Sequence, residues 1–466
     1  MPDLSFAIVE GLVALQHELL LFAAVFFAIG LLDELAVDAI YIWHRLRGRL
    51  KTLPFAESEQ ARQKLSGLAA VFIPAWQESE VIGPTIAHAL TAWPQENLRI
   101  YVGCYRNDPQ TADAVRGAAQ EDARVRIVVV DADGPTSKSH CLNYLHAALC
   151  EDEIREGQKA HMVVLHDAED MVDPAALALL DEAIQDADFV QLPVMALPPA
   201  SSRWVASHYS DEFAESHAKA MPVRDLLGCA VPGAGVGCAF ARPILARLAE
   251  ESGGTPFPEI SLTEDYELGL RIHALGGRTR FVRRRGQDGR LIATRAYFPD
   301  TIRQSVRQKT RWTHGIALQS WDRLGWDGRF LQRWMTMRDR RGPLAAILLG
   351  IAYTLVLTGI VLHGASEAGL VRETDLSPAL RALLLLTFAG LLWRIVMRGI
   401  FTAREYGWQQ GLFAMPRVFV SNIIAIMSGR RAFLAYVRAL RGAPVLWDKT
   451  QHSAHPARPP IGGKPA

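Results

Sequence analysis

The sequence contains few cysteines, and no two of them are spaced as a metal-binding or redox pair. Its five cysteines are scattered between Cys104 and Cys238, without a CxxC pair. Isolated cysteines of this kind are typical of a reducing compartment, in which thiols stay unpaired. We therefore expect buried or free thiols, and neither a zinc site nor a disulfide framework.

An excess of charge of either sign is also missing. The chain has 50 Lys and Arg residues against 49 Asp and Glu residues, which gives a formal net charge of +1 at pH 7. Proteins that bind nucleic acid usually carry a strong basic excess. We therefore expect no nucleic acid among the partners. Internal repeats are absent as well.

Long apolar runs, in contrast, are present. Leu344 to Leu362 is free of charge and long enough to span a bilayer, and Ala379 to Phe401 is a second such run. Leu12 to Trp43 is a third, less pure run. Acidic residues precede it where a signal peptide has basic ones, so we interpret it as an anchor and not as a cleaved signal peptide. For the shorter stretch from Gly411 to Ser428, which Pro416 interrupts, we favour an interfacial or re-entrant helix over a fourth span.

Charges beside these runs predict their orientation. Basic residues cluster at 45–51, at 338–341 and at 398–404, whereas the loop between the last two spans is mainly acidic. By the positive-inside rule, the large middle segment is cytoplasmic and the N-terminus lies outside. The predicted parts are an N-terminal transmembrane helix (1–50), a cytoplasmic domain (51–340), two transmembrane helices (341–403), an interfacial or re-entrant helix (404–445) and a disordered tail (446–466).

Three acids follow the apolar centre of the first span. Glu34 and Asp38 lie about one helical turn apart and share a face, whereas Asp33 points roughly 100° away from Glu34. Carboxylates at such a depth usually face protein or water rather than lipid. We expect the pair Glu34 and Asp38 to meet basic groups of another helix.

The middle segment alternates between strand and helix patterns. Predicted strands run from Leu68 to Ile73, from Leu98 to Cys104, from Val125 to Val130 and up to His166, and helical patterns separate them. Such alternation predicts an α/β domain with a mostly parallel sheet and right-handed crossovers. Every predicted strand runs into polar residues, which indicates one crevice lined by several loops.

The last of these strands ends in a group of acids. In the stretch from Met162 to Asp170, the apolar run is followed by Asp167, Glu169 and Asp170. Asp167 and Glu169 are two residues apart, so on an extended chain their side chains point the same way. Two hard oxygen ligands that face one point suit a divalent metal on a diphosphate. The alternative is a polar exit from the strand without a metal.

Three further signals follow along the chain. A glycine-rich turn lies between Cys229 and Arg242, the sequence LTEDYE introduces a helix at Leu262, and a helical stretch carries Gln308, Arg311 and Trp312.

Together and in this order, the motifs DAED, TED and QxxRW resemble those of family 2 glycosyltransferases of the GT-A fold. The likeness is closer to membrane synthases such as those of cellulose and hyaluronan, and within them to the phage-adsorption type of bacterial inner-membrane glycosyltransferase. It covers roughly Leu68 to Trp321 in motifs and the flanking spans in layout. The implied fold is a GT-A nucleotide-sugar-binding domain, with flanking helices on a mostly parallel sheet, plus about three transmembrane helices and one interfacial helix.

The resemblance also implies roles for single residues. Donor-binding positions are Glu78, Asp108, Lys138, Asp167 and Arg311. Asp167 and Glu169 match the pair that holds Mg²⁺ or Mn²⁺. Asp265 matches the general base, with Glu264 as a weaker candidate, and Gln308 and Trp312 match acceptor-binding positions.

Some positions depart from the family pattern. Glu169 stands where the family has a second Asp, so its reach changes by a methylene group, and Asp170 is an alternative ligand. Lys309 adds a charge inside the QxxRW element. The small number of spans puts a complete translocation channel within one chain in doubt, so export would need a homo-oligomer or a secretion partner protein.

The resemblance implies an inverting enzyme that uses a nucleotide sugar, with uridine diphosphate as the expected carrier, to extend an exopolysaccharide processively. Its partners would be the nucleotide-sugar donor, the glycan acceptor and membrane lipid. One alternative is transfer of a single sugar to a polyprenyl-phosphate lipid. Another is a catalytically silent membrane receptor or scaffold on the same fold. A transporter is disfavoured because the spans are few and form no paired halves.

Several of these residues also have ordinary structural explanations. Asp265 could cap the helix that follows it, Lys138 could be a solvated helix residue, and Trp312 could pack beside Ile316. Trp76 and Tyr105 could stack on a base or only fill the rim. The basic run from Arg283 to Arg285 could meet anionic lipid or lie in solvent. His166 and His314 are expected to pack or to form local hydrogen bonds.

Overall fold

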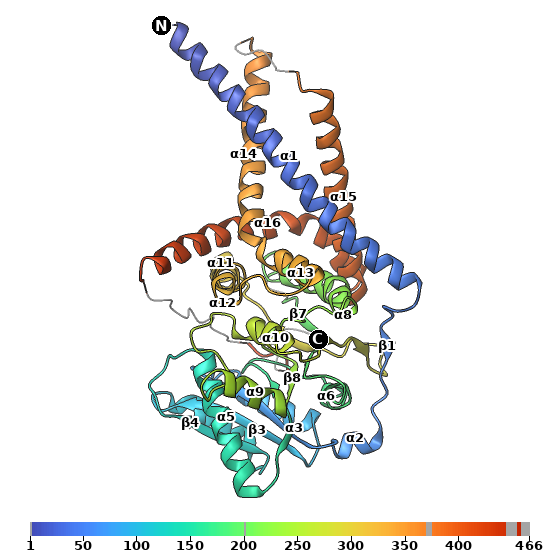
Figure 1. The fold of residues 1–466 in the computed structure, drawn as a ribbon, viewed down its shortest axis with the longest axis vertical. Coiled ribbons are helices and arrows are strands. Elements are labelled where there is room, and N and C mark those ends of the chain that lie inside the picture. Colours follow the sequence, from blue (N-terminus) through green and yellow to red (C-terminus); the bar gives the residue numbers. More distant parts are fainter. Residues whose placement is uncertain (1, 200–201, 370–374, 444–453, 458–466) are drawn as a thin grey trace.

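A computed structural model provides the structure of the chain, and it describes all residues except 1, 200–201, 370–374, 444–453 and 458–466. Figure 1 shows an α/β domain from which α1 (Pro2–Leu46), α14 (Gly342–Glu367) and α15 (Pro378–Tyr406) project, with α16 (Trp408–Leu440) lying across their base. Most of the tail predicted to be disordered lies outside the described residues. Within its described part, Nε2 of His455 lies 3.2 Å from the carbonyl oxygen of Asp170.

The α/β domain is built on a seven-stranded sheet of order β4-β3-β2-β5-β8-β6-β9. Its strands are β2 (Leu68–Pro74), β3 (Leu98–Tyr105), β4 (Val125–Val130), β5 (Ala160–Leu165), β6 (Phe189–Gln191), β8 (Cys238–Ala241) and β9 (Thr279–Phe281). All neighbours pair in parallel except β8, which runs antiparallel to both β5 and β6. The predicted mostly parallel sheet is therefore confirmed.

Strand β2 shows why the sheet is buried on both faces. Its side chains alternate, so that Ala69, Val71 and Ile73 join one core cluster while Ala70 and Phe72 join the other. The first cluster is covered by α3 (Ile82–Ala92), α4 (Pro109–Ala119) and α6 (Ala176–Ile184), and the second by α5 (Lys138–Glu156), α9 (Arg242–Glu251) and α10 (Glu264–Ala274). A continuous apolar strand is what such a double-sided core requires.

Shorter elements complete the domain. Strands β7 (Val194–Leu197) and β11 (Thr294–Tyr297) form a parallel pair, as do β1 (Leu53–Pro54) and β10 (Arg284–Arg285). The remaining helices are α2 (Glu59–Gln63), α7 (Ser207–Glu215), the π-helix η1 (Ser216–Ala220), α8 (Met221–Leu226), α11 (Ile302–Trp312), the π-helix η2 (Thr313–Gln319), α12 (Ser320–Leu324) and α13 (Phe330–Arg340).

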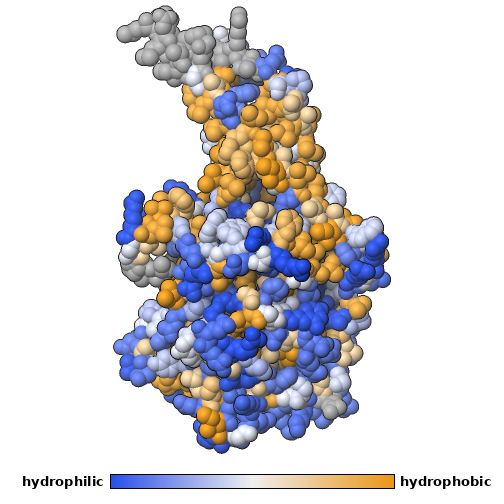
Figure 2. Space-filling view, in the orientation of Figure 1, coloured by the Kyte–Doolittle hydropathy of each residue, from blue (hydrophilic) through white to orange (hydrophobic). Residues whose placement is uncertain are grey.

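The long helices are α1 (Pro2–Leu46), α14 (Gly342–Glu367), α15 (Pro378–Tyr406) and α16 (Trp408–Leu440). Within the described residues, four helices are long and apolar enough to cross a membrane. Three of them, α1, α14 and α15, form the predicted spans, and Figure 2 shows their apolar surface as a band above the polar domain.

Helix α16 differs from the other three in its direction. It runs across the base of α14 and α15 in Figure 1 and packs against both of them. The helix continues through Pro416, which interrupts its apolar stretch. By length and composition α16 could also span a membrane, so its interfacial placement stays a prediction, which its direction favours.

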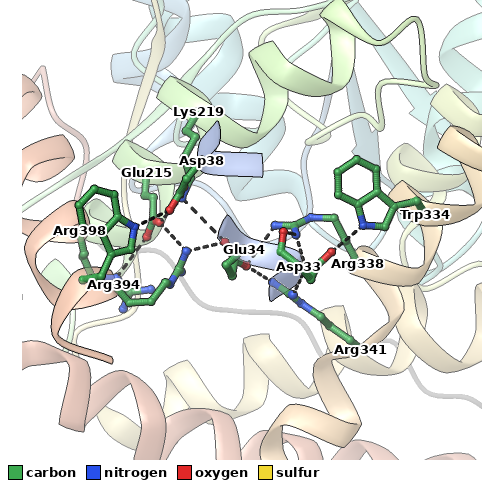
Figure 3. Close-up of polar contacts among 11 residues, drawn as sticks. Asp33, Glu34, Asp38, Glu215, Lys219, Trp334, Arg338, Arg341, Arg394 and Arg398 are labelled. Carbon is green, nitrogen blue, oxygen red and sulfur yellow. Dashed lines mark hydrogen bonds and ion pairs between the residues drawn. The ribbon is translucent and has the colours of Figure 1, made fainter. Parts of the chain in front are cut away.

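A cluster of charges joins α1 to the rest of the molecule (Figure 3). We call it the α1 ion cluster; it consists of Asp33, Glu34, Asp38, Glu215, Lys219, Arg338, Arg341, Arg394 and Arg398. Nζ of Lys219 lies 2.6 Å from Oδ1 of Asp38, and Nη1 of Arg394 lies 2.5 Å from Oε2 of Glu34. The prediction that Glu34 and Asp38 meet basic groups of other helices is confirmed.

The basic run at 283–285 is not used as expected. Arg283 and Arg285 donate to the carboxylate of Glu405, near the end of α15, over 2.5 Å and 2.9 Å. Neither predicted environment, solvent or anionic lipid, included this protein partner, and contact with lipid stays a prediction. Their partner is 120 or more residues away in sequence, which local sequence patterns do not reveal.

Candidate active site

One cavity lies where β2, β3 and β5 end. Its lining includes every predicted site residue except Asp108, namely Glu78, Lys138, Asp167, Glu169, Glu264, Asp265, Gln308, Arg311 and Trp312. Trp76 and Tyr105 also line it, and their rings meet edge to face with centroids 5.2 Å apart. The carboxyl ends of parallel strands are where open α/β sheets bind their ligands.

Asp108 supports the cavity from outside. Its carboxylate caps α4 by accepting the backbone N–H of Thr111, and it also accepts the N–H of Gln77 over 2.6 Å. The Thr111 hydroxyl accepts the N–H of Glu78 over 3.0 Å. These bonds fix the loop that carries Glu78, in which Gln77 has a φ of 51°. Asp108 therefore holds the loop from which Glu78 lines the cavity, and donor binding by Asp108 stays a prediction.

The acidic motif after β5 is held by its own last residue. Asp170 is 2% exposed; it accepts the N–H of Asp167 over 2.9 Å and lies 2.9 Å from Nδ1 of His166. Its carboxylate is therefore engaged in folding the loop, as is His166. Asp167 and Glu169, the other two acids of this motif, line the cavity.

Lys138 is the first residue of α5, and it points into the site rather than into solvent. Its Nζ lies 2.5 Å from Oδ1 of Asp167 and 3.3 Å from the carbonyl oxygen of Gly235. Burial alone would lower the pKa of Lys138, but the neighbouring carboxylates of Asp167, Glu264 and Asp265 outweigh it and raise that pKa. The ammonium group therefore stays charged within the cavity.

The TED motif opens helix α10. The helix begins at Glu264 with Thr263 as its N-cap, so the alternative of Asp265 as the capping residue is wrong. Oδ1 of Asp265 accepts the N–H of Tyr266 over 2.8 Å. A carbon placed on Gly235 would lie 2.5 Å from Oδ2 of Asp265, and Gly235 has a φ of +77°. The glycine-rich turn therefore lets the backbone approach this carboxylate closely.

The pKa values of both acids of this motif, Glu264 and Asp265, are raised. Burial raises the pKa of Glu264 to about 7, and the charge of Asp265 adds to that shift. Burial also raises the pKa of Asp265, although the positive charge of Lys138 opposes it. A carboxylate whose pKa approaches neutrality is a better proton acceptor than an ordinary one.

Helix α11 contributes the third group. Trp312 meets Tyr209, Phe213 and Phe298 edge to face, with ring centroids 5.9–6.4 Å apart, and still lines the cavity. Packing and a site role therefore coexist for this residue. Among the described residues, Nε of Arg311 and Oε1 of Gln308 are buried without a hydrogen-bond partner. Both are candidates for contact with a ligand.

Some residues that shape the site were not anticipated. The Oε1 of Gln319 accepts the N–H of Leu262 over 2.9 Å, and a carbon on Gly315 would lie 2.4 Å from Oγ1 of Thr263. Arg323 pairs with the fully buried Glu267 over 2.9 Å. These contacts attach η2 and α12 to the TED loop. In the sequence, the one indication of this close contact is a glycine, Gly315, within a helical pattern.

Lys309 does not add its charge to the cavity. It forms an ion pair with Glu212 of α7, and Oε1 of Glu212 accepts a hydrogen bond of 2.7 Å from Ser421 of α16. Lys309, the residue that departs from the family pattern, thus connects α11 to α7, and through Glu212 to α16.

The charges of the cavity suit a divalent cation. Six carboxyl side chains line it against the two cationic side chains of Lys138 and Arg311. Within the described part of the chain, no three His, Cys, Asp or Glu side chains converge closely enough to hold a metal by themselves. Asp167 and Glu169 fit Mg²⁺ or Mn²⁺ if donor oxygens and water complete the coordination, as is common for magnesium bound to phosphates.

Comparisons with known proteins give matches along most of the chain. Residues 67–315 match the family model described as "Glycosyltransferase like family 2". Over 454 residues the chain is 33% identical to bacteriophage adsorption protein B of Escherichia coli K12 and to bacteriophage N4 adsorption protein B of Escherichia coli O157:H7. These alignments cover 92% of this chain, which spans 61% of the relatives' length.

A solved structure shares the fold. The mannosyltransferase PcManGT from Pyrobaculum calidifontis, in complex with GDP-Man and Mn²⁺, superposes with a TM-score of 0.52 at 17% identity. The match covers 87% of this chain and 99% of that one. It therefore includes long helices as well as the α/β domain, and the domain has the GT-A fold.

Proposed function

Because the chain belongs to glycosyltransferase family 2, whose members are transferases of EC 2.4 type, we propose that it uses a nucleotide sugar to extend an exopolysaccharide processively. The observation that carries this proposal is that the DAED, TED and QxxRW motifs line one cavity. The donor is a uridine diphosphate sugar, and the anomeric carbon is inverted.

The donor side of the cavity neutralises the leaving diphosphate. Asp167 and Glu169 would hold Mg²⁺ or Mn²⁺, which supplies charge stabilisation at the diphosphate. Lys138, which already contacts Asp167, and Arg311, whose Nε is buried, add positive charge at the same place. Glu78, on the loop held by Asp108 and Thr111, orients the nucleoside.

The acceptor side supplies the proton acceptor. Asp265 removes the proton of the acceptor hydroxyl as that oxygen attacks the anomeric carbon, and its raised pKa suits this task. Trp312 offers an indole face to the terminal sugar, and Gln308 offers the amide oxygen that has no partner among the described residues. Adjacent residues of α11 thus serve the donor and the acceptor.

The membrane placement follows from the charges beside the spans. The α/β domain lies in the cytoplasm of a bacterial inner membrane, with α1, α14 and α15 crossing it and α16 at its inner surface. The Escherichia coli relatives are named for bacteriophage adsorption, an event at the cell surface, and an exported glycan would reach that surface. Few spans make a homo-oligomer or a secretion partner necessary for export.

The test is a donor panel. The purified chain in lipid nanodiscs is incubated with uridine and guanosine diphosphate sugars, since the structural relative holds GDP-Man, and products are separated by length. We expect nucleotide release and a chain of sugars with one uridine donor and with Mg²⁺ or Mn²⁺. Full activity in excess chelator would contradict the metal role, and Asp167→Ala or Glu169→Ala should weaken donor binding.

The same panel separates the alternatives. A lipid carrying one sugar would favour single-sugar transfer to a polyprenyl phosphate. Absence of turnover with every donor, in a folded protein, would favour a catalytically silent receptor or scaffold.

A further inference from the structure

A second cavity, of about 670 Å³, lies beside the domain's connection to the membrane helices. It is bordered by the segment after α1 (48–53), by α8, by residues 277–284 around β9 and by Arg404 near the end of α15. It shares no lining residue with the candidate active site. Helix α10 carries Asp265 near its start, and His273 near its end lines this cavity, about 12 Å further along the helix axis.

The lining of this cavity, which we call the basic cavity, is dominated by positive charge. Seven of its side chains are Lys or Arg, and Asp225 is the one carboxylate among its described lining residues. Asp225 is already bound to Arg280 over 3.0 Å. Arg283 and Arg404 share Glu405. Within the described residues, no ion pair involves Arg49, Lys51, Arg278 or Arg284.

The α1 ion cluster provides a contrast within the same molecule. There, carboxylates of Asp33, Glu34, Asp38 and Glu215 stand among the cations, so that each cation faces an acid (Figure 3). The basic cavity has no such balance. Cationic side chains that surround a cavity of this size without matching acids attract an anion from outside the chain.

Arg283 is affected by the positive charges around it. Its side chain is 7% exposed. Burial lowers its pKa to about 10, Glu405 opposes that shift, and the positive charges of Arg404 and Arg285 add to it. Its Nε is buried without a hydrogen-bond partner among the described residues. A bound anion would relieve this repulsion and accept that N–H.

We propose that the basic cavity binds a ligand bearing phosphate groups. Arginine forks match phosphate oxygens in a bidentate manner, and the volume is in the range of small-molecule sites, roughly 300–1,000 Å³. Arg49 and Lys51 lie a few residues after α1, and Arg404 lies in the last turn of α15, so the cavity adjoins the ends of two helices that we place across the membrane. The phosphate can therefore come from an anionic phospholipid or from a soluble phosphorylated compound.

The test uses the full chain in neutral detergent micelles and two probes, inorganic pyrophosphate and phosphatidylglycerol. The cavity variant is Lys51→Gln/Arg278→Gln/Arg284→Gln. The control is Lys64→Gln/Arg116→Gln/Lys159→Gln, which removes the same charge from exposed positions outside both cavities. Both variants keep the active-site cavity, so pyrophosphate bound there contributes equally to both measurements.

We expect the cavity variant to lose roughly 100-fold in affinity for at least one probe at low salt, since each cation near such a site contributes about fivefold. The control should stay within about twofold of the unmodified chain. A loss confined to phosphatidylglycerol identifies a lipid headgroup, and a loss with pyrophosphate identifies a soluble ligand. Equal affinities of both variants for both probes would overturn the proposal.

Folding is checked independently of binding. Donor turnover should be the same in both triple variants, because none of these residues lines the active-site cavity. If the cavity variant does not fold, the single exposed change Arg278→Gln replaces it, with an expected loss of about fivefold. An unchanged affinity of that folded single variant for both probes would equally overturn the proposal.

Discussion

At the scale of single residues, Asp265 is the side chain on which the proposed chemistry depends. Asp265→Asn keeps the shape and the hydrogen bond from the Tyr266 N–H but cannot take a proton. We expect transfer to fall by at least about 100-fold while donor binding is nearly unchanged. Single-turnover transfer and donor affinity are measured on the same preparation. Glu264→Gln is the matched control, and transfer at the normal rate in Asp265→Asn would remove Asp265 from the mechanism.

The raised pKa values of Glu264 and Asp265 predict a pH dependence. A carboxyl group with a raised pKa stays protonated in mild acid and cannot act as a base there, so kcat/KM should rise with pH in a range above the usual pKa of an aspartate. The charge of Asp265 helps to raise the pKa of Glu264, and the interaction is mutual. In Glu264→Gln the rise should therefore move to lower pH. A flat profile from mild acid to mild alkali would contradict this assignment.

Much of the site could be predicted from the sequence. The spacing of Asp167 and Glu169 at the end of a buried strand predicts a metal site, and the family resemblance predicts a donor-binding role for Lys138. All three residues line one cavity. The part played by Asp108 was not foreseeable in the same way. Its bonds to the Gln77 and Thr111 N–H groups depend on a loop conformation with positive φ at a non-glycine residue, which residue type does not indicate.

At the scale of elements, helix α7 joins the parts of the molecule. Glu212 contacts α11 and α16, Asp211 binds the fully buried Arg417 of α16 over 2.8 Å, and Glu215 contacts Arg394 and Arg398 of α15. Burial raises the pKa of Asp211 to about 7, although Arg417 opposes that shift. The helix that carries Trp312 is thereby coupled to the helices that meet the membrane.

The buried pair Lys219 and Asp38 predicts a stability effect. Both side chains are 2% exposed, and Lys219 also binds Glu215 over 2.9 Å. Lys219→Met would leave two buried carboxylates without their shared cation, which costs about 3–5 kcal/mol. We expect a lowered unfolding temperature in nanodiscs, and partial recovery in Asp38→Asn/Lys219→Met.

The exposed Lys159, which forms no ion pair within the described residues, gives the control Lys159→Met. This change should leave the unfolding temperature unchanged. If Lys219→Met unfolds at the same temperature as the control, the α1 ion cluster does not hold α1 to the domain.

The sequence did not predict which distant residues form ion pairs with each other. It predicted that Glu34 and Asp38 need cations, because carboxylates at that depth are costly alone. It did not identify Lys219 and Arg394, which are 181 and 360 residues from their partners. The basic cavity is hidden for the same reason, since separate short segments compose it.

At the scale of the whole molecule, the arrangement of the helices predicts a topology. Reporters fused after Arg49, Arg341 and Arg404 should report cytoplasm, and one at Gly369 should report the opposite side, because basic residues flank the spans asymmetrically. A reporter after Gly442 tests α16, which lies across the base of the spans (Figure 1). We expect cytoplasm there. The opposite side at Gly442 would make α16 a fourth span, and cytoplasm at Gly369 would contradict the model of three spans.

The central claim is that this cavity builds a chain of sugars whose growing end rests on Trp312. The most direct measurement is the length distribution of the product made by the unmodified chain and by Trp312→Ala, with donor hydrolysis followed in parallel. The account predicts a product of several sugars, and a loss of polymer in Trp312→Ala that clearly exceeds the loss of donor hydrolysis. A product of one sugar from the unmodified chain, or an equal loss of both activities in Trp312→Ala, would contradict it.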